Sequence, residues 1–143
     1  MTTEQKAALV VYARLTRASE RISARVHRHL AEVDLTISQF GVLDALAKLG
    51  PLSQTELAEK ILRTSGNMTL VVDNLERRGL VVRKTSPTDR RVSRAHLTPE
   101  GESLYRGLFP KHAATVEREI GCLSGAQQRQ LSRLCRKLAA RRG

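Results

Sequence analysis

Two short clusters of residues, both between positions 64 and 94, carry the chemistry that this sequence offers. The first stands at the start of a helix expected over residues 65–78 and consists of small polar residues: Thr64, Ser65, Gly66, Asn67 and Thr69. An asparagine amide can pair with adenine through two hydrogen bonds, a hydroxyl suits several bases, and glycine allows close backbone approach. These residue types are those with which a helix reads base edges in the major groove of DNA.

The second cluster is basic and follows a change in the hydrophobic period. Residues 80–85 and 92–97 are expected to form two short β-strands, joined by the turn sequence at 86–89. The charged residues of this predicted hairpin are Arg83, Lys84, Asp89, Arg90, Arg91 and Arg94. An arginine-tipped hairpin fits the minor groove of A·T-rich DNA, where negative potential is concentrated, and Asp89 could hold a neighbouring arginine extended. Any one of these residues could instead be an ordinary solvated turn residue.

Local signals predict the elements that position both clusters. Ser53 and Glu56 form a capping box that starts a short helix ending near Lys60, and a turn over 62–64 separates this helix from the next. Gly79 is placed to end the 65–78 helix in a left-handed conformation. A short helix, a tight turn, a second helix and a basic hairpin together predict a winged helix-turn-helix over residues 36–98, with DNA as the partner.

Helices are also expected on both sides of this motif. They cover residues 5–33, 38–49 with Ser38 as the N-cap, 99–120 with a kink at Pro110, and the segment after the capping box that begins at Ser124. The expected fold is mainly α with a small β-hairpin wing, in the order α-α-α-α-β-β-α-α. Residues 1–35 and 99–143 have apolar faces that the middle section does not cover, so we expect both to be dimerisation segments of a two-fold homodimer.

The composition agrees with a partner of negative charge. Lysine and arginine number 25 against 14 acidic residues, a formal net charge of +11, which attracts nucleic acid, an anionic membrane surface or an acidic protein. No apolar run approaches the roughly 18 residues that a membrane span needs, and no signal peptide is recognisable. With only two cysteines, the sequence is no disulfide scaffold, and a cytoplasmic protein with no membrane contact is predicted.

Residues 36–101 resemble the MarR family of bacterial regulators. The resemblance is carried by Leu35-Thr36-Ile37-Ser38-Gln39-Phe40, Leu57-Ala58, Ser65-Gly66-Asn67-Met68-Thr69, the run from Val72 to Val81, Asp89-Arg90-Arg91 and Leu97-Thr98-Pro99-Glu100-Gly101. It implies a triangular homodimer with two winged motifs on a pseudo-palindromic DNA site, and half-sites about 34–36 Å apart. It also implies that Arg91 enters the minor groove, oriented by Asp89, and that residues 64–69 read the major groove. Leu70 departs from the basic or polar residue that many relatives carry there.

The resemblance further implies a repressor that releases DNA when a small, often phenolic, anion binds between the dimer helices and the winged domain. Candidates for lining that pocket are Tyr12, Arg17, His29 and Phe40. An arginine beside aromatic rings suits an aromatic carboxylate. Ordinary packing and solvation of these four residues is the alternative interpretation.

Other kinds of site find little support in the sequence. Some relatives sense oxidants through a cysteine near the start of the first helix, but here the cysteines are Cys122 and Cys135, interpreted as buried small hydrophobes of the dimer region, with an intersubunit disulfide as the alternative. The histidines at 27, 29, 96 and 112 have no metal-binding spacing, and neither a metal nor a cofactor is predicted. Without a phosphate loop, nucleophile elbow or carboxylate cluster, an enzyme is not expected. The alternatives are a basic architectural or RNA-binding protein without sequence preference and a winged helix that binds only protein.

Overall fold

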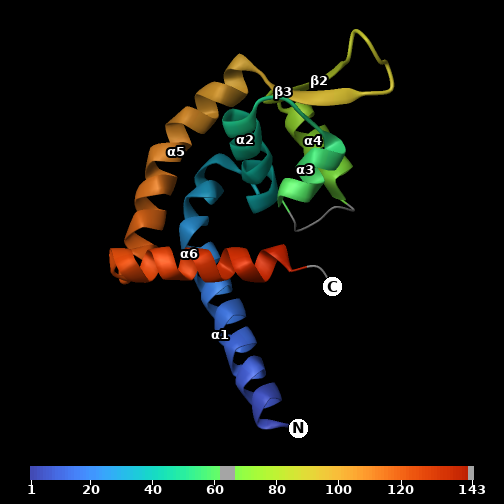
Figure 1. Ribbon diagram of the computed structural model, residues 1–143. Helices are drawn as coiled ribbons and strands as arrows, with labels where there is room; N and C mark the ends of the chain where they lie inside the picture. Colours follow the sequence, from blue (N-terminus) through green and yellow to red (C-terminus); the bar gives the residue numbers. More distant parts are fainter. Residues whose placement is uncertain (62–66, 142–143) are drawn as a thin grey trace. The chain divides into compact units, whose positions relative to one another are not determined.

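The structure is a computed structural model that describes residues 1–61 and 67–141 (Figure 1). The chain forms two compact units. The first takes Met1–Val26 and Lys111–Gly143, and the second takes His27–Pro110. Within the described residues, no helix combines the length and apolar character required to cross a bilayer.

The second unit holds the small sheet and most of the short helices. Its elements are η1 (Arg28–Val33), α2 (Ile37–Leu49), β1 (Leu52–Ser53), α3 (Gln54–Ile61), α4 (Met68–Arg77), β2 (Val81–Thr85) and β3 (Ser93–Leu97), followed by the first half of α5 (Pro99–Ile120). The sheet is antiparallel with the order β1-β3-β2, so Ala95 on β3 lies between Leu52 and Arg83. The loop between β2 and β3 extends beyond the helices of this unit (Figure 1).

An aliphatic core holds these elements together. Leu43, Leu57 and Leu75, one each from α2, α3 and α4, are fully buried. The ring of Phe40 stacks on Tyr105 of α5 with 5.9 Å between centroids. The Tyr105 hydroxyl donates a hydrogen bond of 2.5 Å to an Asp44 carboxylate oxygen, so α5 is joined to α2 by both apolar and polar contacts.

Several helix ends follow the local signals in the sequence. The capping box of Ser53 and Glu56 is formed, with reciprocal hydrogen bonds of 3.2 and 3.0 Å. The box at Ser124 is formed as well. Gly79 has φ of 75° and ends α4, as predicted, because this left-handed conformation carries no penalty for a residue without Cβ. The predicted cap of α2 was wrong: Thr36, not Ser38, caps the helix, because Gln39 three residues later completes its capping box.

The expected single helix over 5–33 was also wrong. The first helix, α1 (Thr3–Val26), ends at Val26 and a separate 3₁₀ helix, η1, follows. The reason is that the apolar residues of this stretch serve two different units. Leu30 is buried in the core of the second unit, whereas α1 belongs to the first. Asp34, with φ of 57°, then turns the chain toward α2.

Strand β1 was missed, and with it the three-stranded character of the sheet. Two residues carry too little alternation to be recognised, and only their pairing with β3 reveals the strand. The hairpin strands themselves were correctly predicted to within one residue at their starts.

The first unit consists of α1, the second half of α5 and α6 (Gly125–Ala140). Helix α5 continues through Pro110 without interruption. Arg25 of α1 forms an ion pair with Glu119 of α5. Large apolar side chains are exposed on α1 and α6. A groove of about 520 Å³ on this unit is lined by residues that include Val11, Leu15, Leu131, Leu134 and Leu138.

Candidate nucleic-acid interface

Helix α4 presents one buried and one exposed face. Met68, Val72 and Leu75 pack into the core, while Thr69 and Leu70 are exposed at the start of the helix. Asn67 is exposed directly before the first helical residue. Of the predicted base-reading residues, Thr64, Ser65 and Gly66 lie outside the described residues.

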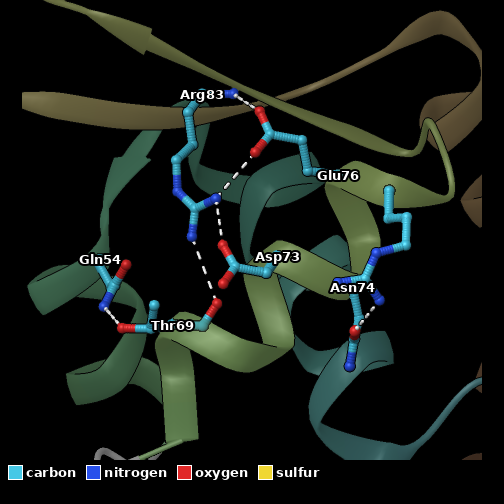
Figure 2. Close-up of polar contacts among 7 residues, drawn as sticks. Gln54, Thr69, Asp73, Asn74, Glu76 and Arg83 are labelled. Atoms are coloured by element: carbon cyan, nitrogen blue, oxygen red, sulfur yellow. Dashed lines mark hydrogen bonds and ion pairs between the residues drawn. The ribbon is translucent and has the colours of Figure 1, made fainter.

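Thr69 is held by two neighbouring elements (Figure 2). The side-chain amide of Gln54, at the start of α3, donates a hydrogen bond to the Thr69 hydroxyl oxygen. The carbonyl oxygen of Thr69 accepts a longer hydrogen bond, 3.4 Å, from the guanidinium of Arg83 on β2. The first turn of α4 is therefore connected to both α3 and the sheet.

Arg83 is directed at the protein rather than at solvent. Its guanidinium lies 2.7 Å from an Asp73 carboxylate oxygen and 2.9 Å from one of Glu76, and its backbone N–H donates to Glu76 at 3.0 Å (Figure 2). The Arg83 side chain is only 26% exposed. Its predicted contact with DNA stays a prediction, and the observed geometry favours a supporting role.

The tip of the hairpin is ordered by its own hydrogen bonds. The backbone N–H of Ser86 donates to the carbonyl of Val92 at 2.8 Å, which closes the loop. Asp89 accepts hydrogen bonds from the backbone N–H of Arg91 at 3.0 Å and from its Nε at 3.2 Å. The predicted salt bridge is thus confirmed, and it leaves the Arg91 side chain 92% exposed. Arg90 beside it is exposed too.

Lys84 and Arg94 face each other on neighbouring strands. They are directly opposite in the β2–β3 register, and both are exposed. Like charges in this position repel, so an anion near the hairpin would relieve an unfavourable contact. Hydrogen bonds from the backbone N–H and the hydroxyl of Ser53 lower the pKa of the Glu56 carboxyl, and the charge of Arg94 lowers that pKa by a smaller amount. The Glu56 carboxylate therefore offsets a small part of the positive charge of Arg94.

The four candidates for an effector pocket are divided between the two units. His29 and Phe40 belong to the second unit, where both are buried and their rings meet edge to face with 6.0 Å between centroids. Tyr12 and Arg17 lie exposed on α1 in the first unit. The structure therefore brings together one pair of the four, and the pocket stays a prediction.

Both cysteines are exposed in the single chain. Their interpretation as buried residues of the dimer region, and the alternative of an intersubunit disulfide, stay predictions. Cys135 lines the apolar groove of the first unit. Among the described residues, no group of three or more histidine, cysteine, aspartate or glutamate side chains is arranged to hold a metal ion.

Sequence reasoning missed the supporting residues of the interface: Gln54, Asp73 and Glu76. A signal was available, because Asp73 and Glu76 are three positions apart and therefore share one face of a helix. Two carboxylates on one face favour a basic partner nearby, and the following strand supplies Arg83.

Helices α2, α3 and α4, the three-stranded sheet and the projecting basic hairpin define a winged helix-turn-helix protein. Comparison with known proteins leads to the same class. The family model "MarR family" matches residues 35–93. The regulator MhqR of Bacillus subtilis is 40% identical over 110 residues, which cover 77% of this chain and 76% of that protein.

Two solved structures extend the likeness to nearly the whole chain. BpsR of Bordetella bronchiseptica, whose DNA binding is regulated by 6-hydroxynicotinic acid, superimposes with a TM-score of 0.83 at 27% identity over 92% of this chain and 94% of its own. Sco3205 of Streptomyces coelicolor, solved in complex with DNA, gives 0.84 at 28% identity over 97% and 88%. This chain belongs to the MarR family. It is a DNA-binding transcription regulator, not an enzyme.

Proposed function

We propose that this regulator is a homodimeric repressor that binds a pseudo-palindromic operator and leaves it when a small aromatic anion binds. The observation that carries the DNA-binding part is the hairpin tip. Asp89 holds Arg91 in an ion pair at 3.2 Å while 92% of the arginine side chain remains exposed. A cation that is both oriented and accessible is suited to the narrow minor groove.

In this proposal, the two clusters contact DNA in different ways. The start of α4, with Asn67 and Thr69, enters the major groove and discriminates bases. Arg91 and Arg90 occupy the minor groove beside it, while Lys84 and Arg94 approach the phosphates. The contacts of these four basic hairpin residues add affinity for any DNA sequence and make binding sensitive to salt.

The exposed apolar side chains of the first unit support the homodimer. Leu9, Val11 and Leu15 of α1 are 40% exposed or more, as are Leu131 and Leu134 of α6. So many large apolar side chains on two helices of one unit mark a protein contact surface. A second copy covers them in the commonest way, through a two-fold axis. We therefore assign dimerisation to the parts of the predicted segments 1–35 and 99–143 that form the first unit, residues 1–26 and 111–143. The predicted DNA-binding residues 36–98 lie within the second unit.

Regulation by an aromatic anion rests on two observations. It comes from the similarity to BpsR, which responds to 6-hydroxynicotinic acid, and from the aromatic pair of His29 and Phe40. The cationic and phenolic groups predicted for this pocket are Arg17 and Tyr12. The cytoplasmic location stays a prediction from the sequence.

Fluorescence anisotropy with the full-length protein tests the proposal. The DNA upstream of its own gene is titrated against a scrambled duplex of equal length, at two salt concentrations. Preference for the native duplex of about a thousandfold or more supports a specific regulator. Equal and salt-sensitive affinity for both duplexes supports the architectural alternative instead. A panel of hydroxylated aromatic carboxylates is then added to the complex, and absence of any effect on affinity contradicts the effector assignment.

A further inference from the structure

A polar network connects the sheet to the first turn of α4 (Figure 2). Arg83 reaches from β2 to the carboxylates of Asp73 and Glu76 at 2.7 and 2.9 Å, and to the carbonyl oxygen of Thr69 at 3.4 Å. These three partners lie on consecutive turns of α4, and Glu76 also accepts from the Arg83 backbone N–H at 3.0 Å. The contacts of this one guanidinium thus reach from the first turn of α4 to its last turn.

The charges of Asp73 and Glu76 explain why an arginine suits this position. Asp73 and Glu76 stand three positions apart on one helix, where like charges repel. Arg83 compensates both, and its planar fork can bond several acceptors at fixed angles, which a lysine ammonium cannot do. The Arg83 side chain is about one-quarter exposed, so solvent screens these pairs less than those of a surface arginine.

Thr69 is fixed from two sides. Arg83 bonds its carbonyl oxygen, and the Gln54 amide bonds its hydroxyl oxygen from α3. Thr69 is nevertheless exposed, on the first turn of the helix that reads bases. A base-reading group must be held within a fraction of an ångström to distinguish one hydrogen-bonding pattern from another.

We infer that Arg83 and Gln54 are positioning residues that set base discrimination by fixing Thr69, and that Arg83 itself does not bind a phosphate. The inference rests on the proposed reading of DNA by α4. It reverses the expectation from the sequence, in which Arg83 was one of several basic hairpin residues in contact with DNA.

Arg83→Gln in the full-length protein is the test, with Lys84→Gln as the matched control on the same strand. The preferred operator is first selected from random duplexes with the wild-type protein. Affinity is then measured for this operator and for duplexes with single base changes, across a salt series. We expect Arg83→Gln to lower discrimination about tenfold at one base pair per half-site and to leave the salt slope unchanged.

The control should behave in the opposite way. Lys84→Gln should weaken binding to all duplexes alike and reduce the salt slope by about one per wing. Arg83→Lys keeps the charge but not the fork, so it should restore the melting temperature more fully than it restores discrimination. A reduced salt slope with intact discrimination in Arg83→Gln would show a phosphate contact and overturn the inference.

A second variant covers the case in which Arg83→Gln fails to fold. Gln54→Ala removes one exposed side chain and leaves the ion pairs in place, and it should lower discrimination at the same base pair as Arg83→Gln. Unchanged discrimination in Gln54→Ala overturns the inference. If the wild-type protein selects no preferred duplex, the proposed function fails and this inference fails with it. If the wild-type preference is clear and either folded variant leaves discrimination unchanged, the positioning role is refuted and the proposed function stands.

Discussion

Replacing Arg91 with alanine should change how DNA binding depends on salt. Each arginine that neutralises a phosphate environment contributes about 0.9 to the slope of log affinity against log salt. A two-fold dimer has two wings, so Arg91→Ala should reduce the slope by about 1.8. Between 50 and 200 mM salt, the wild-type affinity should then fall about 12-fold more than the affinity of the variant.

The structure separates this effect from folding. Arg91 is 92% exposed and its partner Asp89 is 41% exposed, and ion pairs this open contribute about 0–1 kcal/mol to stability. The melting temperature of Arg91→Ala should therefore match that of the wild type. The loss of affinity should be similar for the operator and for unrelated duplexes, because the arginine contributes mainly charge.

Arg106→Ala is the matched control. Arg106 on α5 is 77% exposed and pairs with Glu102 at 2.7 Å, so the substitution removes a comparable arginine and ion pair outside the hairpin. Its salt slope should equal that of the wild type. An Arg91→Ala protein with unchanged affinity and unchanged slope would refute the assignment of the hairpin tip to DNA.

Three further predictions concern stability and assembly. Gly101→Ala should lower the free energy of unfolding in urea by about 3 kcal/mol or more, because a Cβ at this position would lie 2.0 Å from the carbonyl oxygen of Leu80. An unchanged urea midpoint would contradict this close packing. Burial, and then the hydrogen bond to Asp44, raise the pKa of Tyr105 well above its ordinary value. The stability that this phenol supplies over Tyr105→Phe should therefore be constant up to about pH 10, the unfolded pKa, and should decline at higher pH. A constant difference through pH 11 in denaturant titrations would contradict this expectation. Leu134, 52% exposed on α6, lies on the surface that we assign to the dimer, so Leu134→Glu should shift the mass in sedimentation equilibrium from two chains toward one. A wild-type protein that is itself monomeric would exclude the dimer.

Local signals were reliable where a few neighbouring residues decide the structure. The caps at Ser53 and Ser124 and the left-handed Gly79 depend on contacts within about four positions, so the sequence contained all that was needed. The cap at Thr36 was equally local, but Ser38 offered a competing hydroxyl. The decisive residue was Gln39, which completes a box only with Thr36.

Signals were misleading where distant parts of the chain compete for one segment. The spacing of apolar residues from Ile22 to Val33 fits one helix, yet Leu30 is buried in the core of the second unit and the helix ends at Val26. Strand β1 has two residues, and its existence depends on a partner more than 40 positions away. Periodicity records which residues are apolar, not which core receives them.

By itself, the sequence determined the class of the protein: a basic chain with a helix-turn-helix, an arginine-rich hairpin and apolar flanking helices. It also determined the Asp89–Arg91 ion pair, because the side chains of residues two positions apart can meet within a single turn. Only the tertiary structure decided what each basic residue contacts. Arg83 and Arg91 have the same charge and lie in the same hairpin. One faces Asp73 and Glu76 on a neighbouring helix, and the other faces solvent at the tip. Charge is a property of the residue, whereas the partner of a charge depends on how separate elements pack against each other.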